Sequence, residues 1–150
     1  MDYFIAKALP EDIETIARFQ VDLALATEHL TLDPETVLRG VRNVFKKPDI
    51  GFYLVARDPE GKPAGSLLIQ KEWSDWRNAE AWWIHSVYVL PEHRRQGIFR
   101  KLFEYAESLA RTEGVFALRL FVEQNNRTAK TAYCETGMSS GHYDLMEKGL

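Results

Sequence analysis

Apolar residues recur at every second position in some stretches of the chain and at helical spacing in others, and these two periods predict strands and helices. In the first half, they predict a strand, two helices and then three strands. A turn at 58–63, rich in Asp, Pro and Gly, joins two of these strands in a hairpin. The expected strands are residues 3–8, 50–57, 64–72 and 81–90, and the expected helices begin at 9–12 and, behind the capping residue Asp33, at Pro34.

The rest of the chain is organised around the strand at 81–90 and the amphipathic helix that follows it. The strand is almost wholly apolar or aromatic, which is typical of burial on both faces, and the helix carries its apolar stripe from Ile98 to Leu109. The remaining elements are a strand at 115–122, a short helix at 126–136 ended by Gly137, and a strand at 141–146. The order βααβββαβαβ, with hairpins first and one parallel crossover, indicates an α+β fold with a mixed sheet.

The turn between this strand and its helix has the properties of an anion site. Free backbone N–H groups and a partial charge of roughly +0.5 lie at a helix N-terminus. Gly97 has no Cβ, so a ligand can approach the backbone closely. Four cationic residues surround the same turn: Arg94, Arg95, Arg100 and Lys101. The expected ligand is a phosphate, although neither GxGxxG nor GxxxxGK followed by Ser or Thr is present.

Two motifs resemble those of the GNAT superfamily of acyl-CoA-dependent N-acyltransferases. The segment 94–99, RRQGIF, resembles the R/Q-x-x-G-x-G/A loop of that family, and 87–92 resembles the strand that leads into it. The segment 126–138 is similar to the second motif, N-x-x-A-x-x-x-Y-x-x-x-G-F. Two motifs in the right order, about 30 residues apart, are more specific than either alone. Phe99 departs from the usual Gly or Ala, so its side chain must turn into the packing between helix and sheet.

The resemblance implies a GNAT fold, a mostly antiparallel mixed sheet with helices on both faces, and acetyl-CoA as cosubstrate without a metal. In that fold the central strand and the strand at 115–122 splay apart and admit the pantetheine arm. Backbone groups near Val87 and Val89 would pair with pantetheine, and the amides of 95–99 would hold the pyrophosphate. The residues assigned to acetyl-CoA are Val87, Tyr88, Val89, Arg94, Arg95, Gln96, Gly97, Ile98, Phe99, Arg100, Asn126, Ala129 and Tyr133.

The implied reaction is direct acetyl transfer from the sulfur of CoA to an amine. Tyr133 aligns with the tyrosine that protonates the leaving thiolate, and a phenol with a pKa of about 10 suits that role. Its alternative is an aromatic residue that only packs one face of a short helix. Asn126 would hold pantetheine by its side-chain amide, or would simply cap the helix.

His85 is the candidate base, and an imidazole can take a proton directly or through water. On a regular strand it would share a face with Trp83, Val87 and Val89, where several family members carry a glutamate. The alternative is a buried neutral histidine bonded to a carbonyl, and both remain open.

The turn at 72–77 is the candidate site for an amine acceptor. Trp73 and Trp76 beside Asp75 could hold a cation by ring face and charge together, and Trp83 could add a further ring. In the alternative, the tryptophans cover the sheet edge and Asp75 forms a solvated pair with Arg77.

Composition narrows the class of protein. A chain of 150 residues with 45% hydrophobic residues fits a single globular domain, 1–150, and a net charge of −3 argues against a nucleic-acid partner. There is no leader pattern and no apolar run long enough to span a membrane, so a cytoplasmic location is expected. Cys134 is the only cysteine, and no histidine spacing suggests a metal. The acceptor would be a small-molecule or peptide amine, and a homodimer stays open. The main rival function is a non-catalytic acyl-CoA-binding or sensory module.

Overall fold

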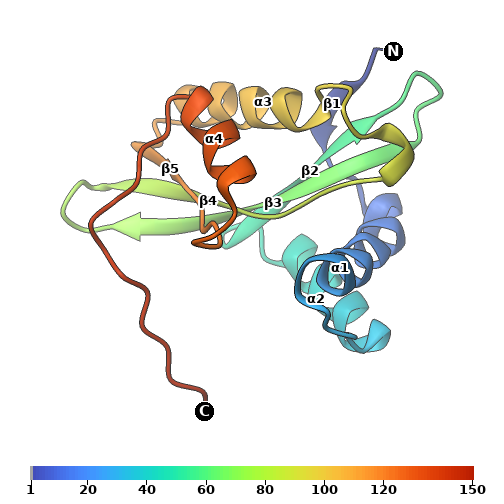
Figure 1. Ribbon diagram of the computed structural model, residues 1–150, viewed down its shortest axis with the longest axis horizontal. Helices are drawn as coiled ribbons and strands as arrows, with labels where there is room; N and C mark the ends of the chain where they lie inside the picture. The colour runs from blue at the N-terminus through green and yellow to red at the C-terminus, as the bar shows by residue number, and fades with distance from the viewer. Residues whose placement is uncertain (1) are drawn as a thin grey trace. The chain divides into compact units, whose positions relative to one another are not determined.

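The structure is a computed structural model that describes residues 2–150 as two compact units, one ending at Leu120 and the other running from Phe121 to Leu150 (Figure 1). The first unit holds most of the secondary structure. Its strands are β1 (Phe4–Lys7), β2 (Gly51–Arg57), β3 (Pro63–Ser74), β4 (Ala79–Val89) and β5 (Ala117–Arg119). Its helices are α1 (Ile13–Glu28), α2 (Pro34–Lys46) and α3 (Ile98–Thr112), with short 3-10 helices at Pro10–Asp12 and Pro91–His93.

The strands form one sheet in the order β1-β2-β3-β4-β5. β1 with β2, β2 with β3, and β3 with β4 are antiparallel pairs. β4 and β5 are parallel, because α3 crosses over between them. Figure 1 shows α3 along one face of this sheet and α1 with α2 on the other. The predicted α+β class, a mixed and mostly antiparallel sheet flanked by helices on both faces, is therefore confirmed.

Alternation along β2 divides the core between these two faces. Tyr53 and Val55 pack with Ile16 and Ala17 of α1 and with Val41 of α2. On the other face lie residues such as Leu54, Leu67 and Ile69, and α3 buries its own apolar stripe. The buried residues of α3 are Ile98, Leu102, Phe103, Ala106 and Ala110.

The predicted side-chain caps form at the N-termini of the helices that follow Asp33 and Asn126. The carboxylate of Asp33 accepts hydrogen bonds from the backbone N–H and the hydroxyl of Thr36, at 3.1 and 2.6 Å, and these bonds hold the pKa of Asp33 below its usual value. Pro34 is the first residue of α2, where its missing N–H costs no hydrogen bond. In the C-terminal unit, Asn126 caps α4 (Arg127–Glu135) through a 3.0 Å bond from the N–H of Ala129, and Gly137 follows with a left-handed φ of 94°.

Two predicted strands differ from the structure. The strand expected at 141–146 is wrong, because 139–150 contain neither helix nor strand. Tyr143, Leu145 and Met146 of this segment are 83%, 71% and 91% exposed, so it buries no apolar face, as a stable strand would. The strand expected at 115–122 shrinks to β5, partly because the N–H of Val115 bonds the carbonyl of Ala110 and so belongs to the end of α3.

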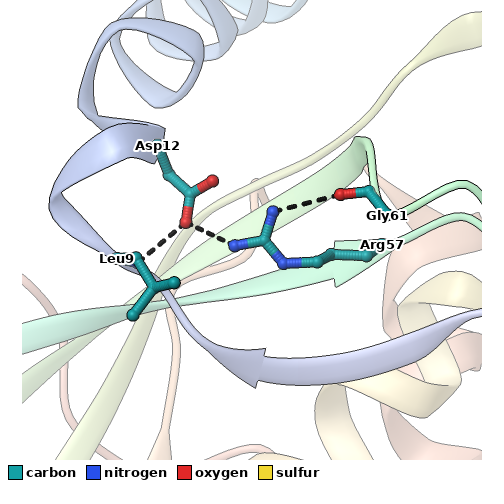
Figure 2. A network of polar contacts seen from close by, with 4 residues as sticks. All are labelled: Leu9, Asp12, Arg57 and Gly61. Carbon is teal, nitrogen blue, oxygen red and sulfur yellow. Dashed lines mark hydrogen bonds and ion pairs between the residues drawn. The ribbon is translucent and has the colours of Figure 1, made fainter.

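A buried ion pair joins the start of α1 to the end of β2 (Figure 2). The Nη2 of Arg57 donates to the Oδ2 of Asp12 at 2.6 Å, and the N–H of Leu9 donates to the same oxygen at 2.7 Å. The Nη1 of Arg57 donates to the carbonyl of Gly61 in the β2–β3 turn at 3.3 Å. The side chains of Arg57 and Asp12 are only 11% and 3% exposed, so each charge depends on the other for solvation.

We expect Asp12→Asn to lower the free energy of unfolding by about 1.5–3 kcal/mol, since the amide can still accept from Leu9 but leaves a buried guanidinium without its counter-charge. Urea denaturation of both proteins measures the difference. The matched control is Glu60→Gln, which breaks the pair between Glu60 and Lys62, whose side chains are 73% and 74% exposed. The control should change stability by less than about 0.5 kcal/mol. Equal effects in the two variants would mean that burial adds nothing to the Asp12–Arg57 pair.

Candidate functional site

The turn before α3 forms an open backbone surface. After the 3-10 helix Pro91–His93, Arg95 and Gly97 both adopt left-handed conformations, with φ of 61° and 76°, and α3 begins at Ile98. A Cβ added at Gly97 would meet no protein atom within 4 Å, so the space above this residue is free for a ligand. A left-handed φ at a non-glycine residue such as Arg95 costs about 1–3 kcal/mol and is found most often at functional sites.

The exposed arginines of the turn differ in their contacts. The Nε of Arg94 donates to the carbonyl of Val89 at 3.0 Å, so this side chain ties the turn back to β4. Arg95 and Arg100 are exposed, and Arg100 forms an exposed pair with Glu104 one helical turn later. Positive charge therefore surrounds the N-terminus of α3, as an anion site requires.

Phe99 contacts Phe103 one turn later in α3. Its side chain is half-buried, and its ring centroid lies 6.2 Å from that of Phe103, which is buried in the helix–sheet packing. This contact agrees with the expectation that Phe99 turns into that packing, because a ring on the ligand side would crowd a pyrophosphate.

A β-bulge in β4 changes which residues share a face. Leu68 pairs with His85 but Ser66 pairs with Tyr88, so β4 has one residue more than β3 over this interval. Ser86 takes up the extra length with a left-handed φ of 53°. The expectation that His85 shares its face with Val87 and Val89 is therefore wrong: His85 and Tyr88 lie on the α1/α2 face, and the two valines lie on the other.

The parallel pair of β4 with β5 is short, and β4 continues beyond it. Paired residues run from Ala81 with Ala117 to Trp83 with Arg119, whereas β4 extends to Val89. The N–H of Leu90 donates to the carbonyl of Ala64 of β3, and backbone groups alternate in direction along a strand. The backbone N–H and C=O of Val89 consequently point away from β3, toward the edge of β4 that β5 does not reach.

His85 and Trp83 lie parallel on the α1/α2 face of β4. Their ring centroids are 6.1 Å apart with an interplanar angle of 8°. His85 is half-buried, and this burial lowers the pKa of its imidazole, which favours the neutral form. Tyr88, farther along the same face, packs against Phe19 of α1 at 5.1 Å, and burial raises the pKa of its phenol.

The predicted acceptor residues are less tightly grouped. Trp73 and Trp76 are 62% and 93% exposed, so neither ring is packed in the core. The guanidinium of Arg77 lies 4.9 Å from the ring centroid of Phe116, and Asp75 is exposed. Of the predicted set, Trp83 lies beside His85.

Arg119 at the end of β5 is a neighbour of this site that the sequence did not indicate. Its Nη1 donates to the Oε2 of Glu72 at 2.6 Å, and its guanidinium carbon lies 5.9 Å from the ring centroid of Trp83. The register that pairs Trp83 with Arg119 causes this meeting, and no local motif encodes it.

The C-terminal unit carries the remaining predicted residues. Asn126 uses its side-chain oxygen as the cap of α4, through the bond from Ala129. Tyr133 lies in α4 and is half-buried, and desolvation raises the pKa of its phenol above the usual value of 10. Its proton is therefore held firmly at neutral pH.

Comparison with known proteins decides the family. The profile of the acetyltransferase (GNAT) family matches residues 14–138. The chain belongs to this family. Among solved structures, this GNAT protein is similar to a "possible acetyltransferase" from Clostridium difficile 630, at 36% identity and a TM-score of 0.92, over 99% of this chain and 97% of that one. The family and this relative together indicate an acyltransferase.

Two more distant structures share the GNAT fold. Glucosamine-6-phosphate N-acetyltransferase from Arabidopsis thaliana matches at 19% identity and a TM-score of 0.74, over 99% of each chain. A transcriptional regulator from Bacillus halodurans C-125 matches at 20% identity and a TM-score of 0.82, over 99% of this chain and 100% of that one. At such identities the likeness concerns the fold alone.

Residues 2–150 contain neither a metal-binding cluster nor a helix that could span a membrane. No group of three or more His, Cys, Asp or Glu residues there is arranged to hold a metal ion. No helix in this part of the chain combines the length and apolar character needed to cross a membrane.

Proposed function

We propose that the protein transfers an acetyl group from acetyl-CoA directly to a primary amine of a small molecule or peptide. The observation that carries this proposal is the edge of β4 beyond Trp83. β5 does not pair with this part of β4, and the strand leads directly to the cationic turn before α3. An extended chain such as pantetheine could accept a hydrogen bond from the N–H of Val89, whose carbonyl already accepts from Arg94, and its pyrophosphate would then meet the N–H groups around Gly97.

In this proposal His85 and Tyr133 move the two protons of the reaction. His85, neutral because of its lowered pKa, takes a proton from the attacking amine, directly or through water. The new N–C bond forms as the C–S bond breaks, and Tyr133 gives its phenolic proton to the departing thiolate. Solvent then returns a proton to Tyr133 and removes one from His85, so the products are an amide and free CoA.

Calorimetry with acetyl-CoA, followed by a thiol-release assay on a panel of primary amines, tests the proposal. Binding together with amine-dependent thiol release supports it. Binding without release on any amine would favour the alternative of a non-catalytic acyl-CoA-binding module, for which Phe99 in the Gly/Ala position is the supporting feature. Failure to bind acetyl-CoA would contradict both functions.

We expect His85→Gln to remove a rising limb from the pH profile of the rate at subsaturating amine. Only neutral His85 can act as base, so the wild-type rate should rise with pH and level off above a pKa that lies below the ordinary value of about 6.5. The amine substrate also loses a proton as pH rises and produces a limb of its own. Two acceptors of different pKa separate the limbs, because only an enzyme limb stays fixed when the substrate changes.

If His85 is instead a packing residue, its substitution should leave the profile unchanged. It should then lower the free energy of unfolding by about 1–3 kcal/mol if a buried partner is left unsatisfied. A full rate in His85→Gln with a limb that follows the amine would assign the proton to water or a backbone carbonyl.

A further inference from the structure

Tyr3 contacts the turn that precedes α3, although 90 residues separate it from His93 in the sequence. Its side chain is 4% exposed, and its hydroxyl oxygen lies 2.8 Å from the Nδ1 of His93 and 3.0 Å from the Oε1 of Gln96. The rings of Tyr3 and His93 meet edge to face at 5.7 Å. Both partners belong to the turn, so one phenol contacts it on either side of Arg94 and Arg95.

With the Gln96 amide oriented as in the structure, the hydrogen bonds of this cluster fit one arrangement of protons. The Nε2 of Gln96 donates to the carbonyl of Glu92 at 3.4 Å, which orients the amide so that its oxygen faces Tyr3. An amide oxygen only accepts, so Tyr3 must donate its single proton to Gln96. The Nδ1 of His93 must then donate to the phenolic oxygen, which requires the Nδ1–H tautomer whenever the ring is neutral.

The backbone of Tyr3 is held by the helix that the turn precedes. The Nζ of Lys101, in the first turns of α3, donates to the carbonyl of Tyr3 at 3.3 Å. Tyr3 is thus connected to the turn through His93 and Gln96 and to α3 through Lys101. These contacts bracket Arg95 and Gly97, which both have a left-handed φ within the turn.

We propose that Tyr3 is a positioning residue, whose hydroxyl holds the turn 92–97 in the conformation that binds the pyrophosphate of acetyl-CoA. The proposal rests on the function proposed above for the same turn. Burial alone would be satisfied by phenylalanine, and the hydroxyl adds contacts only to the turn. A strained backbone such as that of Arg95 persists only when its surroundings fix it, and Tyr3 supplies two of those constraints.

The test is Tyr3→Phe, which removes the hydroxyl and keeps the ring. We expect the Kd for acetyl-CoA to rise roughly five- to tenfold, as the loss of one or two hydrogen bonds implies, while kcat at saturating acetyl-CoA stays unchanged. In the protein without ligand, amide hydrogen exchange at His93 and Lys101, whose N–H groups donate to the carbonyls of Leu90 and Gly97, should accelerate. Nitrogen NMR of neutral His93 should show the Nδ1–H tautomer in the wild type and its loss in the variant.

Two further variants sharpen the result. Gln96→Ala removes the hydrogen bond between Tyr3 and Gln96 from the side of the exposed residue. The double variant Tyr3→Phe with Gln96→Ala should raise the Kd by less than the product of the two single effects, because both changes remove the same bond. Tyr105→Phe, which removes a hydroxyl from an exposed tyrosine of α3, is the control and should leave the Kd unchanged.

Unchanged affinity and unchanged exchange in Tyr3→Phe would overturn the proposal. If the wild-type protein has no affinity for acetyl-CoA, the proposed function fails by itself. The exchange and tautomer measurements on the unliganded protein still decide whether Tyr3 holds the turn: faster exchange supports that role, and identical spectra refute it.

Discussion

Replacing Tyr133 with phenylalanine is expected to lower kcat by roughly 10²–10⁴-fold, the usual contribution of a general acid, while the Kd for acetyl-CoA barely changes. Phenylalanine keeps the ring and its packing in α4 and removes only the acidic proton. Steady-state kinetics at saturating amine, together with calorimetry on the same samples, separate the effect on turnover from the effect on binding.

Partial burial of Tyr133 affects the pH range in which it can act as an acid. Desolvation raises the pKa of Tyr133 above 10, so the phenol stays protonated across the neutral range, and any loss of rate from its ionisation should appear only in strongly alkaline solution. Tyr143→Phe, at an exposed tyrosine of the same C-terminal unit, is the control and should keep full activity. A Tyr133→Phe variant with near-normal turnover would mean that water protonates the thiolate and that Tyr133 only packs.

The fold was predictable where one local period dominated the sequence. The apolar run that became β4, the stripe of α3 and the Asp33-Pro34 start of α2 each encode their element within a few residues. The strand expected at 141–146 failed for the converse reason. Its alternation is local, but a strand also needs a partner and a face to bury, and neither property is written in the segment itself.

The candidate site was predictable as a set of motif positions and not as a geometry. The sequence indicated Gly97 and the cations around it, because glycine and positive charge at a helix start have a direct physical meaning. It did not indicate the bulge at Ser86, which depends on how β4 aligns with β3 and which reverses the side of Val87 and Val89. Tyr3 and Arg119 were missed for a related reason, since their partners come from distant strands and helices.

The second large effect is expected at Gly97, where Gly97→Asp should weaken binding of acetyl-CoA by about 10²–10³-fold. Two like charges about 4 Å apart near a protein surface repel by roughly 4 kcal/mol, which corresponds to about 10³ in Kd before screening by salt. A side chain there would also extend into open space beside the turn, where the proposed function places the pyrophosphate. Calorimetry with acetyl-CoA at two salt concentrations measures both contributions.

Matched variants separate charge, bulk and backbone strain in this experiment. Gly97→Asn has the same size without the charge, so its difference from Gly97→Asp isolates repulsion, and that difference should shrink as salt rises. Gly114→Asp controls for strain, since Gly114 lies past the far end of α3 with a φ of 74°, close to the 76° of Gly97, and equally open space around its missing Cβ. We expect Gly114→Asp to bind acetyl-CoA normally. Equal affinity in folded Gly97→Asp and Gly114→Asp would remove the turn before α3 from the binding site.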